Sequence, residues 1–122
     1  MRLYLTHSTS YDYKNELYEP LKQTLGKEYD IFLPHEEHSE GVKSKDIISE
    51  CDIVLAEVSQ PSTGQGIELG WADSNNKPII CFYRTGSKVS SALRFITNNH
   101  IDYESSSDMI KKLYIEIEHL TN

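Results

Sequence analysis

Positive charge is scarce in this sequence. Its 122 residues carry 12 Lys and Arg against 19 Asp and Glu, which gives a formal net charge of −7. Proteins that bind duplex nucleic acid or anionic membranes use clusters of Lys and Arg, so we expect neither as the main partner. A small anionic ligand stays compatible with this composition, because free N–H groups at the start of a helix can hold one whatever the net charge.

Cysteines and long apolar runs are also scarce. The two cysteines, Cys51 and Cys81, lie in or beside apolar runs and form no C-x-x-C pair, so we expect two buried free thiols in a reducing compartment. The apolar stretch within residues 1–10 is too short for a signal peptide. No run approaches the ~18 apolar residues of a membrane span. We therefore expect a soluble, cytoplasmic protein.

Linkers, repeats and low-complexity segments are absent as well, so the sequence predicts one domain over residues 1–122. Apolar spacing predicts a helix over residues 13–25, kinked or restarted at Pro20 and ended by Gly26. We expect residues 35–43 to form a surface loop and Ser107 to cap a final apolar-striped helix. The other expected elements are strands over residues 2–6, 29–33, 52–58, 78–83 and 100–103, and helices over residues 44–51, 64–75 and 90–96.

This alternation of strands and helices predicts an α/β fold. It is typical of a doubly wound, flavodoxin-like domain with a parallel sheet of about five strands covered on both faces. Ligands of such sheets bind beyond the carboxyl ends of the strands, where the strand order reverses. Three loops rich in Ser, Thr or Gly are expected at those ends: residues 7–10, 59–66 and 84–91.

The segment Glu57–Ala72, EVSQPSTGQGIELGWA, carries the clearest functional pattern. It is not a dinucleotide fingerprint, because the third glycine comes one residue late and the turn is too long, and no Walker lysine follows. Ser62 and Gln65 match an S-x-x-Q capping box, which explains the pattern structurally. The same helix start could instead hold a phosphate, with the ionised carboxylate of Glu68 about one turn further in. Such a carboxylate suits attack on an electrophilic sugar carbon.

Other candidate residues have weaker support. His35-Glu36-Glu37-His38 differs from the H-E-x-x-H zinc motif and lies in the expected surface loop, so we predict no metal site. His7 ends the first strand at the expected ligand edge, where it could contact a ligand or serve the turn. Cys81 lies in mid-strand and is a poor nucleophile candidate. Tyr4 suits core packing, although its hydroxyl could reach the ligand edge.

Three stretches of the sequence resemble a known family. DIVLAEVSQPSTGQGIELGWA (residues 52–72), KPIICFYRTGSKVSSAL (residues 77–93) and LYLTHS (residues 3–8) resemble the nucleoside 2-deoxyribosyltransferase superfamily. Within it, they are more similar to the 2'-deoxynucleoside 5'-phosphate N-hydrolases. The resemblance implies that Glu68 attacks C1' of the sugar to form a covalent glycosyl-enzyme, and that Tyr4 supports it.

The resemblance also implies how substrate is bound. Ser62 stands where the hydrolases use a serine to receive the 5'-phosphate and the nucleoside transferases use an aspartate. Ser91 matches a second phosphate-binding serine that a homodimer partner supplies, and Gly64 and Gly66 let the backbone approach the ligand. His7 and Ser8 fall in the first ligand-edge loop and are further candidates for substrate contact. A hydroxyl at position 62 attracts a phosphate that a carboxylate would repel.

The implied function is cleavage of (2'-deoxy)nucleoside 5'-monophosphates into free base and sugar phosphate, without metal or cofactor. Transfer of the deoxyribosyl group to another base, and nucleotide binding or sensing without turnover, are the alternatives. Two departures from the family pattern bear on this choice. Ser44 stands where the family uses an aspartate for the leaving base, with Asp46 the nearest carboxylate. The first loop has His7 and Ser10 where the hydrolases carry Gly and Arg.

Overall fold

A computed structural model describes residues 1–37 and 44–122 of the chain. Its strands are β1 (Arg2–His7), β2 (Asp30–Phe32), β3 (Ile53–Glu57), β4 (Ile79–Arg84) and β5 (Asn99–Tyr103). Its α-helices are α1 (Glu19–Gln23), α2 (Leu25–Glu28), α3 (Pro34–Glu37), α4 (Ser44–Glu50), α5 (Thr63–Ser74) and α6 (Ser106–Thr121). A π-helical turn, η1 (Lys14–Tyr18), precedes α1, and a 3₁₀ helix, η2 (Ser91–Phe95), precedes β5.

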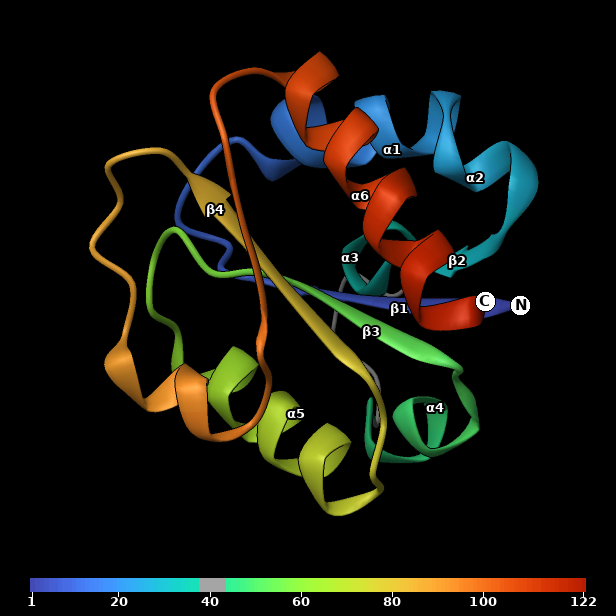
Figure 1. Cartoon of the computed structure of the whole chain (residues 1–122), viewed down its shortest axis with the longest axis vertical. Coiled ribbons are helices and arrows are strands. Elements are labelled where there is room, and N and C mark those ends of the chain that lie inside the picture. The colour runs from blue at the N-terminus through green and yellow to red at the C-terminus, as the bar shows by residue number, and fades with distance from the viewer. Residues whose placement is uncertain (38–43) are drawn as a thin grey trace.

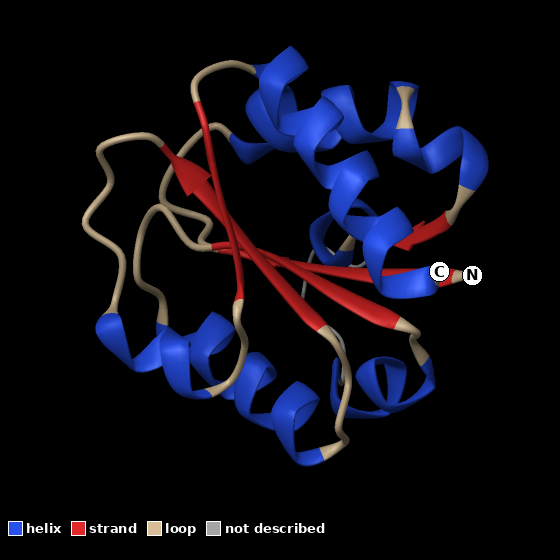
Figure 2. Ribbon diagram, viewed as in Figure 1, coloured by secondary structure: helices blue, strands red, loops and turns tan. Residues whose placement is uncertain are grey.

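The five strands form one parallel sheet in the order β2-β1-β3-β4-β5 (Figure 2). This confirms the predicted doubly wound α/β fold. Every residue of β3 is buried, as expected for a central parallel strand that is covered on both faces. The strand order reverses between β1 and β3, because β2 lies on one side of β1 and the later strands lie on the other.

Helices cover both faces of the sheet (Figure 1). Helices α1, α2 and α6 pack on one face, where Leu5, Leu55 and Leu113 belong to the larger apolar cluster. Helices α4 and α5 pack on the other face, where Tyr4 and Leu69 belong to the second cluster. Side chains alternate between the two faces along each strand, so neighbouring residues of β1 and β3 serve different layers.

The segment predicted as a helix over residues 13–25, kinked or restarted at Pro20, is a succession of short helices. The predicted restart at Pro20 is confirmed, because α1 begins at Glu19. The chain runs through η1 and α1, with Pro20 in the first turn of α1, and breaks at Thr24 before α2. At the break, Thr24 Oγ1 donates to the Pro20 carbonyl at 2.7 Å. The prediction that Gly26 ends the helix is wrong, because Gly26 lies inside α2 and lacks the positive φ of a glycine cap.

The N-cap of α6 also differs from the prediction. Ser105, and not Ser107, accepts a hydrogen bond from the Asp108 amide at 3.1 Å, while the Asp108 carboxylate accepts from the Glu104 amide at 3.0 Å. All five predicted strands and the helices over residues 44–51, 64–75 and 90–96 agree with the structure within one residue at each end.

Three remaining expectations concern a loop, thiols and membrane spans. The prediction of a loop over residues 35–43 is wrong for residues 35–37, which belong to α3, and residues 38–43 lie outside the described part of the chain. Cys51 and Cys81 are buried free thiols, as predicted, and burial raises their pKa values to about 11 and about 12. Across residues 1–37 and 44–122, we find no helix long and apolar enough to cross a membrane.

Candidate functional site

The crevice at the strand-order reversal lies between the carboxyl ends of β1 and β3. The two strands pair up to His7 and Glu57, after which their loops diverge. The buried side chain of Gln65, on the first turn of α5, spans this point. Its Nε2 donates to the Glu57 carbonyl at 2.7 Å and to the Thr6 carbonyl at 3.3 Å. The start of α5 is thereby fixed at the place where sheets of this type bind ligands.

The sequence of α5 fixes where that helix starts. Ser62 has extended backbone geometry and its Oγ accepts a hydrogen bond from the Gln65 amide at 3.5 Å, so Ser62 is the N-cap. The predicted capping box is therefore only half formed, because the Gln65 side chain turns into the sheet instead of back to Ser62. Gly64 and Gly66 follow in the exposed first turns, where added Cβ atoms would meet open space.

The carboxylate of Glu68 is held by hydroxyl groups from β1. Tyr4 donates its phenolic hydrogen to Oε2, and Thr6 donates its Oγ1 hydrogen to Oε1 at 3.0 Å. Tyr4 and Thr6 are both fully buried, whereas Glu68 is only half-buried. Burial, followed by the negative charge of Glu68, raises the pKa of Tyr4 far above its ordinary value. The phenol therefore stays protonated and donates to the Glu68 carboxylate.

Ser44, the first residue of α4, lies beside the same cluster. Its hydroxyl hydrogen-bonds to the Tyr4 side chain and lowers the pKa of that phenol, against the larger effects of burial and Glu68. Asp46, the alternative carboxylate suggested by the sequence, is exposed. Residues two apart on a helix do not share a face. The residue of α4 that contacts Tyr4 is therefore Ser44, and the exposed Asp46 lies on a different face of the helix.

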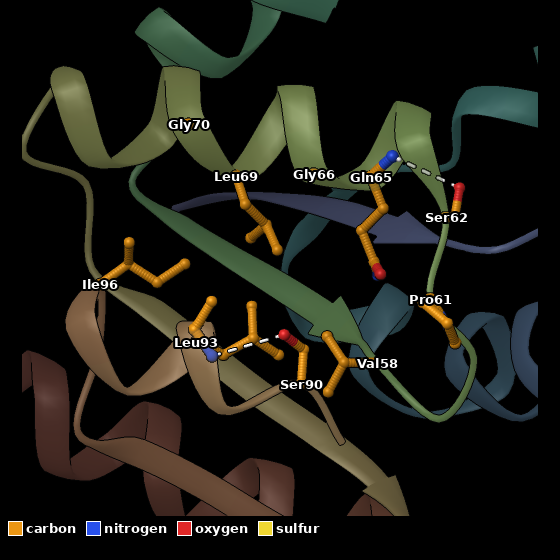
Figure 3. Close-up of a pocket in the computed structure, with 11 residues that line it drawn as sticks. Val58, Pro61, Ser62, Gln65, Gly66, Leu69, Gly70, Ser90, Leu93 and Ile96 are labelled. Atoms are coloured by element: carbon orange, nitrogen blue, oxygen red, sulfur yellow. Dashed lines mark hydrogen bonds between the residues drawn. The ribbon is translucent and has the colours of Figure 1, made fainter. Parts of the chain in front are cut away.

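A cavity of about 340 Å³ lies on the other flank of α5, between that helix and η2 (Figure 3). Apolar side chains such as Leu69 and Leu93 form most of its wall, and Ser62 and Ser90 contribute hydroxyl groups. Glu68 does not line it. Ser91 follows Ser90 but is exposed and does not line the cavity either.

His7 ends β1 with its side chain on the sheet face opposite the Glu68 carboxylate, and Ser8 follows the strand. His7 is 6% exposed, and its neighbours along the alternation of β1 are the core residues of the α6 face. Its Nδ1 donates to the Ser8 carbonyl at 2.8 Å, and its Nε2 accepts from the Tyr18 hydroxyl at 2.7 Å. Burial lowers the pKa of His7 to about 4. Both ring nitrogens are therefore engaged within the protein. The buried Ser8 hydroxyl pairs with Ser10 at 2.8 Å.

The predicted site residues therefore fall into separate groups. Tyr4 and Glu68 come together, Ser62 and Gly66 line the cavity, and the remaining ones lie elsewhere at the ligand edge. The sequence reasoning missed Thr6, although its position two residues after Tyr4 places both on one face of β1. Among residues 1–37 and 44–122, no three His, Cys, Asp or Glu side chains gather as a metal-binding group, and His38 of the rejected metal motif lies outside those ranges.

Comparison with known proteins assigns the chain. Residues 5–116 match the family described as nucleoside 2-deoxyribosyltransferase. The chain belongs to this family. The resemblance inferred from the sequence is thereby confirmed.

Two curated proteins that are similar to this chain are named as hydrolases. One is the 5-hydroxymethyl-dUMP N-hydrolase of Esox lucius, 30% identical over 96 residues, which cover 64% of the chain and 66% of the relative. The other, from Trichoplax adhaerens, is provisionally named 2'-deoxynucleoside 5'-phosphate N-hydrolase 1; it is 32% identical over 97 residues, which cover 69% of the chain and 67% of the relative. Matches to three such relatives span from 46% to 67% of their full lengths.

A solved structure shares the fold over nearly the whole chain. It is the CMP N-glycosidase of Clostridium botulinum, with a TM-score of 0.69 and 24% sequence identity, covering 93% of this chain and 98% of that one. Because the two sequences are only 24% identical, this likeness shows that the two proteins share a fold and nothing about their activities.

Proposed function

We propose that the protein hydrolyses the N-glycosidic bond of (2'-deoxy)nucleoside 5'-monophosphates, with Glu68 as the nucleophile. The single observation that carries the proposal is the Glu68 carboxylate, which is half-buried, held on both oxygens by protonated hydroxyls, and located in the second turn of the helix that Ser62 caps. Family membership supports it, as do the names of the relatives, which are hydrolases of nucleotides.

The proposed reaction has two steps. A Glu68 carboxylate oxygen forms a bond to C1' as the C1'–N bond breaks, and the base leaves with that electron pair and takes up a proton. Water then attacks C1', the bond to Glu68 breaks, and the water's second proton is released to solvent. Two inversions give retention at C1', as in two-step glycoside hydrolysis. The hydroxyls of Tyr4 and Thr6 keep the carboxylate oriented for attack.

We assign phosphate binding to the start of α5. The Ser62 hydroxyl and the free N–H groups of the first helical turn, including those of Gly64 and Gly66, offer donors to an anion, and the helix dipole favours negative charge there. No carboxylate occupies position 62, which favours a phosphate-bearing substrate over a nucleoside.

We further propose that Ser91 acts in a neighbouring subunit. Ser91 is exposed on η2, and the nearby Phe95 is 85% exposed while Ile67 on α5 is 51% exposed. Large exposed apolar side chains of this kind are common at subunit interfaces. In a two-fold dimer, equal mixing of the Glu68→Gln and Ser91→Ala variants should recover about one quarter of the wild-type sites, because half of the dimers are mixed and each has one intact site.

The decisive experiment is a panel of ribo- and deoxynucleoside 5'-monophosphates and nucleosides, with release of free base followed by chromatography. Wild type should cleave at least one monophosphate, and Glu68→Gln should lose at least about a thousand-fold in kcat. Asp73→Asn, which changes an exposed carboxylate on the same helix, is the matched control and should keep wild-type activity. Full activity in Glu68→Gln would rule out the nucleophile assignment.

Two rival functions give different outcomes in the same panel. A deoxyribosyltransferase would exchange bases when a second free base is supplied. If Ser62→Asp leaves the preference for phosphorylated substrates unchanged, the assignment of Ser62 to phosphate binding is wrong. A nucleotide-binding protein without turnover would bind a monophosphate and release no base. This last alternative is included because Ser44 lies beside Tyr4 at the position where the family uses an aspartate for the leaving base.

A further inference from the structure

Glu57, the last residue of β3, is a carboxylate buried on the sheet face opposite Glu68. It is only 1% exposed. Its chain neighbours Ala56 and Val58 pack in the α5 layer, so the Glu57 side chain turns toward the α6 layer. Burying a carboxylate is costly unless hydrogen bonds compensate it, and the proposed reaction does not use this one.

Both oxygens of Glu57 accept hydrogen bonds, most of them from the loop that follows. The Ser59 amide donates to Oε1 at 2.6 Å, and the Ser59 hydroxyl donates to Oε2 at 2.9 Å. The Tyr103 hydroxyl, from the end of β5, also donates to Oε2. Burial, and then its hydrogen bond to Glu57, raises the pKa of Tyr103 well above its ordinary value, so this donor stays protonated.

Ser59 in turn joins the loop to β4. Its Oγ accepts a hydrogen bond from the Arg84 amide at 2.9 Å, at the end of β4. The Arg84 side chain hydrogen-bonds to Tyr103, so the contacts close into a network of Glu57, Ser59, Arg84 and Tyr103. We call this set the Glu57 network. It ties the start of the 58–62 loop to the ends of three strands.

The main chain of Glu57 holds the far end of the same loop. Its carbonyl accepts from Gln65 Nε2 at 2.7 Å, and Gln65 lies on the first turn of α5, three residues after Ser62. The Glu57 side chain therefore holds the start of the 58–62 loop through Ser59, and the Glu57 carbonyl holds its end through Gln65. A loop of five residues fixed at both ends has few remaining conformations.

We infer that Glu57 is a positioning residue for anion binding: it fixes the 58–62 loop so that Ser62 and the first amides of α5 meet the substrate's 5'-phosphate. This inference rests on the proposed function. The effect passes through Ser59 and the loop, and Glu57 itself touches no substrate. A positioning role of this kind should appear in KM for phosphate-bearing substrates and leave the chemical step at Glu68 nearly unchanged.

The test is the Glu57→Gln variant, which keeps the size of the side chain but removes the charge and one of its acceptor oxygens. We expect KM for the monophosphate that wild type cleaves fastest to rise roughly ten-fold, with kcat within about two-fold of wild type. Cleavage of the parent nucleoside, which has no phosphate to position, should keep its kcat/KM. Glu104→Gln, which alters an exposed glutamate beside Tyr103, is the matched control and should behave as wild type.

A second readout needs no substrate. In amide hydrogen exchange, Glu57→Gln should accelerate exchange of residues 59–65 and leave the middle of α6 unchanged, since only the loop loses its anchor. Unchanged KM together with unchanged exchange of this loop would overturn the inference. If Glu57→Gln does not fold, Ser59→Ala, which removes the two hydroxyl contacts alone, must raise KM in the same way, and a wild-type KM in that variant would also overturn it.

The proposed function and this inference can fail separately. If wild type cleaves no member of the panel, the proposed function fails, and hydrogen exchange alone decides whether Glu57 holds the loop. If wild type cleaves monophosphates but Glu57→Gln loses kcat with KM unchanged, the positioning role is wrong and the hydrolase function stands.

Discussion

Acidification should destabilise the folded chain through His7. The imidazole is 6% exposed and lies against Tyr13, Tyr18 and His35. Burial lowers its pKa from 6.5 to about 4, and the nearby His35 adds to this fall, against the opposing effect of the hydrogen bond to the Ser8 carbonyl. His7 is therefore neutral in the fold at pH values where the unfolded chain has already bound a proton.

The sign and size of the effect follow from this difference. A base whose pKa is lower in the folded state gives a stability that is complete above pH 6.5 and is lost as the pH falls toward 4. The full difference corresponds to about 3 kcal/mol in the free energy of unfolding, and the part lost between pH 8 and pH 5 is about 2 kcal/mol. Below pH 4 the contribution of His7 changes no further.

The measurement is urea denaturation at several pH values between 8 and 4.5, comparing wild type with His7→Gln. A glutamine side chain keeps an oxygen that can accept from Tyr18 but does not titrate, so the pH dependence of its unfolding should be shallower by about 2 kcal/mol between pH 8 and 5. His119→Gln, at an exposed position of α6, serves as control and should retain the steepness of wild type. Parallel curves for wild type and His7→Gln would refute the reasoning.

Three other substitutions probe the same structure. Thr6→Val removes one donor to Glu68 and should lower kcat about ten-fold in the base-release assay, whereas Thr6→Ser should stay within about three-fold of wild type. Gln65→Leu leaves two strand carbonyls without their donor and should cost about 2 kcal/mol in urea denaturation; a loss under about 0.5 kcal/mol would contradict the bridging role. Leu113→Ala, at a fully buried position, should cost about 3 kcal/mol, and Ile115→Ala, at 48% exposure on the same helix, should cost about 0.5 kcal/mol or less.

Much of the sheet could be read from the sequence because its signals are local. Each strand is a short apolar run bounded by Gly, Pro or polar residues, and the parallel arrangement of about five strands follows from the alternation with helices. The position of the three Ser-, Thr- or Gly-rich loops at the carboxyl ends of the strands follows from the same alternation. The long motif around Glu68 also located the nucleophile candidate, and the side chain does meet Tyr4 as the resemblance implied.

The failures have physical causes beyond the local sequence. The spacing of apolar residues over 13–25 is that of one helix. The Tyr18 hydroxyl, however, hydrogen-bonds to His7 and to the His35 amide, and these partners are 11 and 17 residues away in the sequence. Periodicity carries no information about such contacts. At the start of α6, by contrast, a local signal existed, since the S-x-x-D pattern ending at residue 108 marks the cap that the structure uses.

The site was predicted in part for a similar reason. A strand places every second side chain on one face, so the pairing of Thr6 with Tyr4 could have been deduced once Tyr4 was assigned. The inward turn of Gln65 could not, because a capping box predicts the opposite direction for that side chain. The direction of the Gln65 side chain depends on two strand carbonyls, those of Thr6 and Glu57, which lie side by side only after β1 and β3 have paired.

The π-helical turn at Lys14–Tyr18 has a consequence for natural variation. Such a turn holds one residue more than an α-helical turn of the same span, so a single deletion there would restore regular winding while rotating the preceding loop by about 100° relative to α1. A deletion among residues 14–16 would leave Tyr18 with α1 but would turn Tyr13 away from the rings of His7 and Tyr18 that it now contacts. Homologues that are one residue shorter in this stretch should therefore also differ at position 13, and an alignment of their lengths would reveal the linked change.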